Sequence, residues 1–166
     1  MGLQQKNDQR VRAVAIVLYK AKEASTFLHC IASLSSEKAF RLTDVCGAIV
    51  QKIELVDGNK SWVDVVGSRK RIYITPSPGA SENIKYEVQA VDNSNNKIVS
   101  KVLQGAMLQL YKNVVVTFEV TPASTAKWTI QYEKLDPSNK DPDVYTGLLG
   151  TVNNNVNTYI RYGGEV

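Results

Sequence analysis

Four segments in the second half of the chain alternate apolar and polar residues, which is the period of a β-strand with one buried face. They cover residues 83–91, 97–103, 113–120 and 126–135. The first two are separated by the run from Asp92 to Asn96, and Asn and Asp favour turns because their side chains bond to the nearby backbone. The pattern predicts antiparallel strands in succession, each with one apolar face toward a common core.

The first half of the chain opens with a predicted strand and two predicted short helices. Arg10 to Lys20 is rich in β-branched residues and almost continuously apolar, which predicts a strand buried on much of both faces. Lys22 to Ser33 places its apolar residues at helical spacing. Ser35 opens a second segment of this kind, SSEKAFRL, and a serine there suits the N-terminal cap of a short helix.

Further strands are expected before the alternating segments. Val45 to Val56 predicts a second strand, and Asp57-Gly58 after it is a strong hairpin signal, because Asp-Gly pairs accept positive φ angles. Ser61 to Val66 then predicts a third strand. Gly67 to Glu82 is irregular in pattern, with one short strand at 71–75 and a loop rich in Pro, Gly and Ser.

The chain closes with one long helix. Its start is predicted at Asp141-Pro142, an acidic cap followed by proline in the first turn. The order of elements predicts an α+β fold. In it, a curved antiparallel sheet of about seven strands wraps around the long helix, and two short helices follow strand one. Apolar residues form a single stripe along the long helix: Tyr145, Leu148, Leu149, Val152, Val156, Tyr159 and Ile160.

Length and composition fit one folded domain. The 166 residues are 43% hydrophobic, which is enough for a sizeable core. We expect the domain to span residues 8–162, with flexible ends at 1–7 and 163–166. No apolar run approaches the ~18 residues of a membrane helix, and the polar N-terminus lacks the apolar region of a secretory signal. These features predict a cytoplasmic protein.

Residues that most often carry catalysis or bind metals are scarce. One histidine, His29, and two cysteines, Cys30 and Cys46, give little basis for a metal site or a Ser-His or Cys-His mechanism. We therefore expect no catalytic residue, metal or cofactor, and two reduced, buried thiols. The net charge of +4 is mild, and Arg69-Lys70-Arg71 is its one dense basic cluster. A solvated turn or strand edge explains that cluster better than a nucleic-acid surface, which needs a broad basic face.

Three stretches carry a resemblance to a known family. IKYEVQAVDNSNNKIVSKVLQGAMLQLYKN is similar to a strand, Asp/Asn turn and strand that close with a Gly-Asx-Leu-Leu-x-x-Tyr-Lys segment, here with Ala106 at the acidic position. KWTIQYEKL and DPDVYTGLLGTVNNNVNTYI are similar to the penultimate element and the last helix of the same family. The chain thus resembles the plant major latex proteins, a branch of the birch pollen allergen (Bet v 1-like) superfamily, which has a START-like, helix-grip fold.

Two departures from the family pattern stand out. The family carries a glycine-rich loop between its second and third strands, but here only Gly58 remains, in Asp57-Gly58-Asn59-Lys60. Cradling a phosphate needs several exposed backbone N–H groups, so we expect no phosphate site and no nuclease activity at this loop. Gly67 to Glu82 is longer than the family pattern, and we expect it to extend a hairpin near the cavity mouth or to form a flap.

The resemblance implies a cavity between the long helix and the sheet that holds apolar small molecules, typically ~300–1,000 Å³ in size. Ordinary core packing is the alternative for each apolar wall residue. Strand phase also places Ala90, Ile98 and Val116 on the wall. The phase of strands and helix predicts these ligand-binding residues: Trp62, Asp64, Tyr86, Val88, Ser100, Phe118, Trp128, Ile130, Tyr132, Tyr145, Leu148, Leu149 and Val152.

Several functions stay open at this point. The leading one is binding or carrying a small apolar plant metabolite (a hormone, sterol, flavonoid, fatty acid or alkaloid), with a role in defence or stress. The second is a pocket enzyme of specialised metabolism that catalyses condensation or isomerisation. An inward Asp64 beside Tyr86 would support it, because such a carboxylate could orient an amine or hydroxyl or act as a base.

Two further alternatives involve protein partners. One is an interaction module like the hormone receptors of the wider superfamily, and the other is a member with a collapsed cavity. We expect neither a nucleic-acid partner nor a membrane span, while an exposed sheet edge leaves a weak homodimer open.

Overall fold

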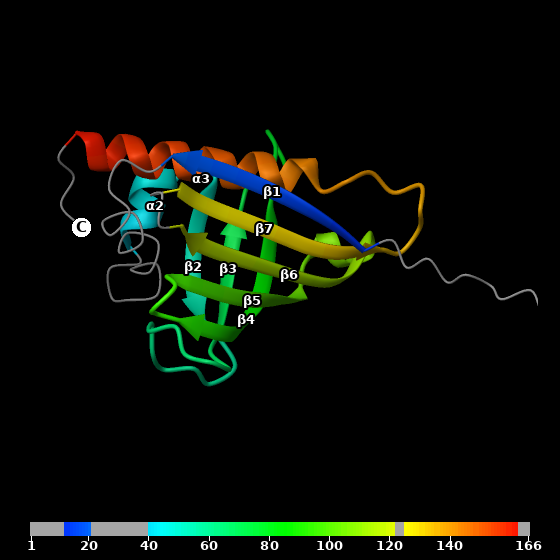
Figure 1. Ribbon diagram of the computed structural model, residues 1–166, viewed down its shortest axis with the longest axis horizontal. Helices are drawn as coiled ribbons and strands as arrows, with labels where there is room; N and C mark the ends of the chain where they lie inside the picture. Colours follow the sequence, from blue (N-terminus) through cyan, green and yellow to red (C-terminus); the bar gives the residue numbers. More distant parts are fainter. Residues whose placement is uncertain (1–11, 21–39, 122–124, 163–166) are drawn as a thin grey trace, which may run out of the picture.

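The computed structural model describes residues 12–20, 40–121 and 125–162. Within them, seven strands form one antiparallel sheet, and the long helix α3 runs across it (Figure 1). The sheet order is β1-β7-β6-β5-β4-β3-β2, so each strand lies beside its neighbour in sequence except β1, which pairs with β7. The α+β class and the sheet wrapped on a C-terminal helix are confirmed.

The elements have the following bounds. The strands are Arg12–Lys20 (β1), Val50–Leu55 (β2), Arg69–Ile74 (β3), Glu82–Asp92 (β4), Lys97–Gln104 (β5), Tyr111–Val120 (β6) and Thr125–Lys134 (β7). The helices are Phe40–Cys46 (α2), the 3₁₀ turn Ala106–Gln109 (η2) and Asp143–Arg161 (α3). The four alternating segments correspond to β4 to β7, and α3 begins directly after Pro142, as its capping residues predicted.

The predicted second strand starts too early. Residues 40–46 form helix α2, and β2 begins only at Val50 rather than at Val45. Gly47 and the residues after it make the turn between them, in which the Ile49 N–H donates to the Cys46 carbonyl at 2.8 Å. The first predicted helix, Lys22 to Ser33, lies outside the described residues, as do His29 and Cys30.

The turn after β2 is correct, but the strand predicted to follow it is wrong. Asp57 and Gly58 have φ angles of 56° and 77°, as a tight turn requires. Ser61 to Val66 nevertheless forms no strand and belongs to a loop over residues 56–68. β3 lies beyond that loop and pairs with both β2 and β4, so residues 69–74 of the irregular Gly67 to Glu82 segment form an interior strand and not a flap.

A bulge in β4 changes which side chains face the helix. The pairing register with β5 shifts between Val88 and Ala90. Val88 is 1% exposed, whereas Ala90 is exposed to solvent. The predicted inward position of Ala90 is therefore wrong, because one extra residue in a strand moves every later side chain to the opposite face.

Apolar side chains from the sheet and α3 form two clusters. The first joins α2 to the C-terminal half of α3 through Leu42, Cys46, Val152 and Val156, together with Phe118 of β6. Figure 1 shows α2 beside this half of α3. The second cluster lies toward the other end of the helix, and its buried members are Val102, Met107, Tyr111, Val114, Ile130 and Tyr132. None of the helices in the described ranges has both the length and the apolarity needed to cross a membrane.

Candidate functional site: a lined cavity

A cavity of about 210 Å³ lies where the inner faces of β3 to β7 meet α3. Side chains from η2 and from the 56–68 loop complete its wall. Its volume is below the ~300–1,000 Å³ of typical ligand pockets that the family resemblance led us to expect. It is therefore suited to a small molecule, or to part of a larger one.

Nine of the thirteen predicted ligand-binding residues line this cavity. Helix α3 contributes Tyr145, Leu148 and Leu149, and the 56–68 loop contributes Asp64. The sheet contributes the other predicted residues that line the cavity: Tyr86, Ser100, Phe118, Trp128 and Ile130. Ile98 and Val116, which strand phase also placed on the wall, line it as well.

Four predicted residues lie elsewhere. Val88 and Val152 are buried, at 1% and 5% exposure, but do not line the cavity. Tyr132 is buried in the second apolar cluster, where its ring meets that of Tyr111 edge-on at 5.1 Å. Trp62 is half-buried on the 56–68 loop, and only its carbonyl takes part in the polar contacts described below. These four positions illustrate the alternative of ordinary core or loop packing.

Five lining residues were missed by the sequence analysis. Ile72 and Ile74 belong to β3, which was not recognised as a full strand. A signal was present there, since apolar residues alternate with Arg71 and Tyr73 along the strand. The other missed residues are Ile84, Val102 and Met107, which lie on β4, β5 and η2.

A buried ion pair stands behind the polar part of the wall. Lys70 of β3 is 1% exposed, and its Nζ donates to Asp64 Oδ1 at 2.6 Å and to the Trp62 carbonyl at 2.8 Å. Burial lowers the pKa of the Lys70 ammonium, and the Asp64 charge opposes this shift. The basic cluster is therefore not a solvated turn or edge: it lies in an interior strand, and its central lysine points inward.

Tyr86 lies beside this ion pair. It is the register partner of Lys70 across β3 and β4, and its side chain lines the cavity with Asp64. Burial raises the pKa of the Tyr86 phenol, and the Asp64 charge raises it further, so the phenol is protonated at neutral pH. Among the hydrogen bonds between described residues, none involves the Tyr86 hydroxyl. It can therefore serve as a donor toward the cavity.

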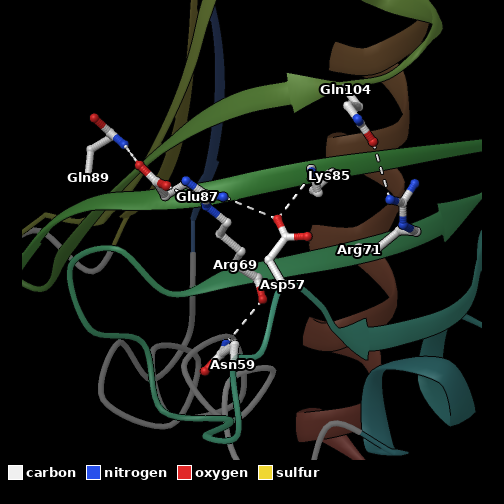
Figure 2. A network of polar contacts seen from close by, with 8 residues as sticks. All are labelled: Asp57, Asn59, Arg69, Arg71, Lys85, Glu87, Gln89 and Gln104. Atoms are coloured by element: carbon white, nitrogen blue, oxygen red, sulfur yellow. Dashed lines mark hydrogen bonds and ion pairs between the residues drawn. The ribbon is translucent and has the colours of Figure 1, made fainter.

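On the opposite face of β3, away from the cavity, a second set of polar contacts attaches the 56–68 loop to the sheet (Figure 2). Asp57 accepts from Arg69 Nη1 at 3.2 Å and from Lys85 Nζ at 3.0 Å, and Figure 2 shows its carboxylate between the two cations. These bonds, Lys85 first, lower the pKa of Asp57. Asn59 Nδ2 donates to the Arg69 carbonyl at 3.1 Å. Because alternate residues of β3 point to opposite faces, the 56–68 loop is attached on both faces of the sheet.

Three further tyrosine hydroxyls have protein acceptors. Tyr111 donates to the Lys140 carbonyl at 2.6 Å, and Tyr132 donates to Asp141 Oδ1 at 2.9 Å. Tyr145, whose ring lines the cavity, donates to Glu82 Oε2 at 2.8 Å. Burial raises the pKa of all three, that of Tyr132 to about 12. These hydroxyls tie the start of α3 and the segment before it to the sheet.

Trp128 and Asn153 form a contact between sheet and helix. The indole Nε1 donates to Asn153 Oδ1 at 2.9 Å, and the Trp128 and Phe118 ring centroids are 4.6 Å apart. Asn153 is 0% exposed, and its Nδ2 has no hydrogen-bond partner in the described structure. The contact fixes the orientation of an aromatic wall residue.

The arrangement suits the binding of an apolar molecule. Within the described ranges, no group of three His, Cys, Asp or Glu side chains is placed to hold a metal ion. The wall is almost entirely apolar, and its polar side chains include those of Asp64, Tyr86, Ser100 and Tyr145. Such a site can enclose an apolar molecule and contact its polar atoms at defined points.

Comparison with known proteins agrees with this architecture. The model of the pathogenesis-related protein Bet v 1 family matches residues 21–162. MLP-like protein 31 of Arabidopsis thaliana is 28% identical over 87 residues, and MLP-like protein 43 of the same plant is 36% identical over 64 residues. These matches cover 49% and 36% of this chain, and they span 51% and 40% of the length of these curated relatives.

Solved structures show the same fold. The major latex-like protein 151 of Panax ginseng superposes with a TM-score of 0.77 at 23% identity, covering 89% of this chain and 97% of that protein. A point mutant of the norcoclaurine synthase of Thalictrum flavum, solved with a transition-state analogue, gives a TM-score of 0.67 at 16% identity, covering 93% and 98%. Because the family model matches residues 21–162, which is most of the chain, the chain belongs to the pathogenesis-related protein Bet v 1 family, and it is similar to major latex-like proteins.

Proposed function

We propose that the protein binds a small apolar molecule in the cavity between the sheet and α3. The observation that carries this proposal is a hollow of about 210 Å³ between the sheet and α3, lined mainly by apolar side chains. Protein interiors normally leave few voids larger than a water molecule, because unfilled space forfeits packing contacts. A bound apolar molecule would restore those contacts.

The test fills the cavity and measures binding. Ser100 of β5 lines the cavity, and its neighbour Val99 is paired with Thr117 and faces the opposite side of the sheet. Ser100→Phe should weaken binding of naphthalenemethanol, a small apolar probe, at least about tenfold in isothermal titration calorimetry. Val99→Phe adds a ring of the same size on the other face and should leave the dissociation constant unchanged.

Two results would contradict the proposal. One is a wild-type protein that does not bind the probe; the other is equal binding by both variants, since the probe would then sit outside the cavity. Circular dichroism of each variant shows whether the fold is retained. A negative heat-capacity change on binding would accompany burial of the probe in an apolar site.

A second candidate, a pocket enzyme, is favoured by one observation. Asp64 and Tyr86 line the same cavity, so a carboxylate and a phenol both face any bound molecule. The Lys70 ammonium already occupies one Asp64 oxygen, so only the other oxygen is left to contact a substrate. A solved norcoclaurine synthase of Thalictrum flavum holds dopamine and hydroxybenzaldehyde. Incubation of this protein with the same two compounds, followed by mass spectrometry, tests this candidate. A product that Asp64→Asn abolishes would replace the binding proposal with a catalytic one.

The size of the hollow supports a binding role over a collapsed cavity, although it is smaller than the resemblance implied. A role in plant defence or stress, a cytoplasmic location and a weak homodimer stay predictions from the sequence.

A further inference from the structure

The ion pair between Lys70 and Asp64 limits the charge that a ligand can bring to this part of the cavity. The two side chains are 1% and 14% exposed, and their charges cancel at a separation of 2.6 Å. A ligand ammonium near Asp64 would meet the like charge of Lys70, and a ligand carboxylate near Lys70 would meet Asp64. Either ligand group would also lose its hydration, which is costly for an ion without a free partner.

Neutral hydrogen-bonding capacity is left over at the same place. Asp64 uses Oδ1 for Lys70, and within the described structure no protein hydrogen bond involves its Oδ2. The Tyr86 hydroxyl likewise has no protein partner among the described residues, and Tyr86 and Asp64 line one cavity. Beside the ion pair, the wall therefore offers the phenol of Tyr86 as a donor and the second carboxylate oxygen of Asp64 as an acceptor.

A hydroxyl group matches this pair because it accepts one hydrogen bond and donates another. We propose that Tyr86 and Asp64 form an anchor for a neutral hydroxyl group, so that the protein selects apolar alcohols or phenols over amines and carboxylic acids. In this arrangement Tyr86 donates to the ligand oxygen, and the ligand O–H donates to Asp64. Lys70 acts behind the wall as the counterion that makes the anchor neutral. The inference rests on the proposed function and names its ligand class.

The experiment uses four probes on one naphthalene frame. Naphthalenemethanol carries the hydroxyl, ethylnaphthalene is the hydrocarbon of similar shape, and naphthalenemethylamine and naphthoic acid carry the two charges. We expect the alcohol to bind at least about tenfold tighter than the amine and the acid at neutral pH. Equal or tighter binding of either charged probe would overturn the anchor.

Two variants separate the anchor from the cavity wall. Tyr86→Phe removes only the hydroxyl. It should weaken binding of the alcohol about fivefold to tenfold and leave the dissociation constant of ethylnaphthalene unchanged. Tyr111→Phe is the matched control, because the Tyr111 hydroxyl donates to the Lys140 carbonyl away from the cavity. This variant should leave the dissociation constants of both probes unchanged.

The outcomes for the two proposals differ. If Tyr86→Phe weakens both neutral probes equally, or neither, Tyr86 is only a wall residue and the anchor is wrong while the binding site stands. If the wild-type protein binds none of the four probes, both the anchor and the proposed function are wrong.

Discussion

The tyrosines near the start of α3 and the tyrosine near the 56–68 loop differ in how their hydroxyls are used. Near the start of α3, Tyr111, Tyr132 and Tyr145 each donate to an acceptor supplied by the protein. Near the 56–68 loop, the Tyr86 hydroxyl has no such acceptor among the described residues, and the nearby carboxylate of Asp64 is already bonded to Lys70. The same side chain thus holds the fold together near the start of α3 and leaves bonding capacity for a ligand near the loop.

The difference arises from what the neighbouring segments bring. The segment before α3 contributes the Lys140 carbonyl and the Asp141 carboxylate, and β4 contributes Glu82. The 56–68 loop contributes Asp64, but β3 places a buried lysine beside it. A buried polar group is stable when it is bonded, so an unbonded hydroxyl in a cavity wall is a reason to look for a ligand.

The largest effect is expected for the ion pair near the 56–68 loop. Lys70→Met leaves the Asp64 carboxylate, 14% exposed, without its counterion, and should lower the free energy of unfolding by about 3–5 kcal/mol. Urea denaturation measures this loss. The double variant Lys70→Met/Asp64→Leu should recover most of the lost free energy of unfolding. The control Lys101→Met, at an exposed position of β5, should change the free energy of unfolding little. A stable single variant would show that the pair contributes nothing to the fold.

Removing single hydroxyls should separate the two kinds of tyrosine directly. Tyr111→Phe leaves the Lys140 carbonyl without its donor and should cost about 1–2 kcal/mol in the free energy of unfolding. Tyr86→Phe breaks no bond between described residues and should cost much less. Equal losses in urea denaturation would mean that Tyr86 has a structural role like that of the other tyrosines.

The Tyr132 phenol predicts a loss of stability at high pH. Its pKa is raised from 10.0 to about 12, mainly by burial and then by its bond to Asp141. Between these values the unfolded chain ionises while the folded chain keeps its proton, so stability is intact below pH 10 and falls as pH rises toward 12. Tyr132→Phe should flatten this part of the profile, by at most about 1.4 kcal/mol per pH unit. An unchanged slope would contradict the assignment.

The smallest effect is expected for the contacts on the outer face of the sheet, away from the cavity. Asp57→Ser removes the bonds to Arg69 and Lys85 that attach the 56–68 loop to the outer face (Figure 2). Pairs with one partner this open to solvent are weak and are screened by salt. The urea midpoint should therefore shift little, and the shift should shrink further at high salt. A large shift that persists at high salt would mean that this outer attachment, rather than Lys70, holds the loop.

Much of the architecture could be predicted from the sequence. The alternating patterns of β4 to β7 and the capped start of α3 are local signals, and they correctly placed Trp128, Ile130, Leu148 and Leu149 on the cavity wall. The point in β4 at which the alternation of inward and outward side chains breaks was not predictable. The bulge near Gln89 interrupts β4 without a glycine or proline to mark it, so the position of Ala90 was misjudged.

The β2 to β3 region shows a different limit. Asp57-Gly58 specifies a turn but not which later segment pairs with β2, and β-branched residues made 61–66 resemble a strand. Asp64 still faces the cavity, because its loop keeps Val63 and Val65 outward. Burial of Lys70 depends on a partner brought by tertiary structure, which a basic run in the sequence does not reveal.

Native mass spectrometry of the protein, purified gently from the cells that express it, tests the binding claim most directly. We expect a complex with one small molecule, which denaturation releases and which mass analysis identifies as an apolar compound. An apo mass alone, together with no binding of naphthalenemethanol by the same preparation, would contradict the claim that the cavity is a ligand site.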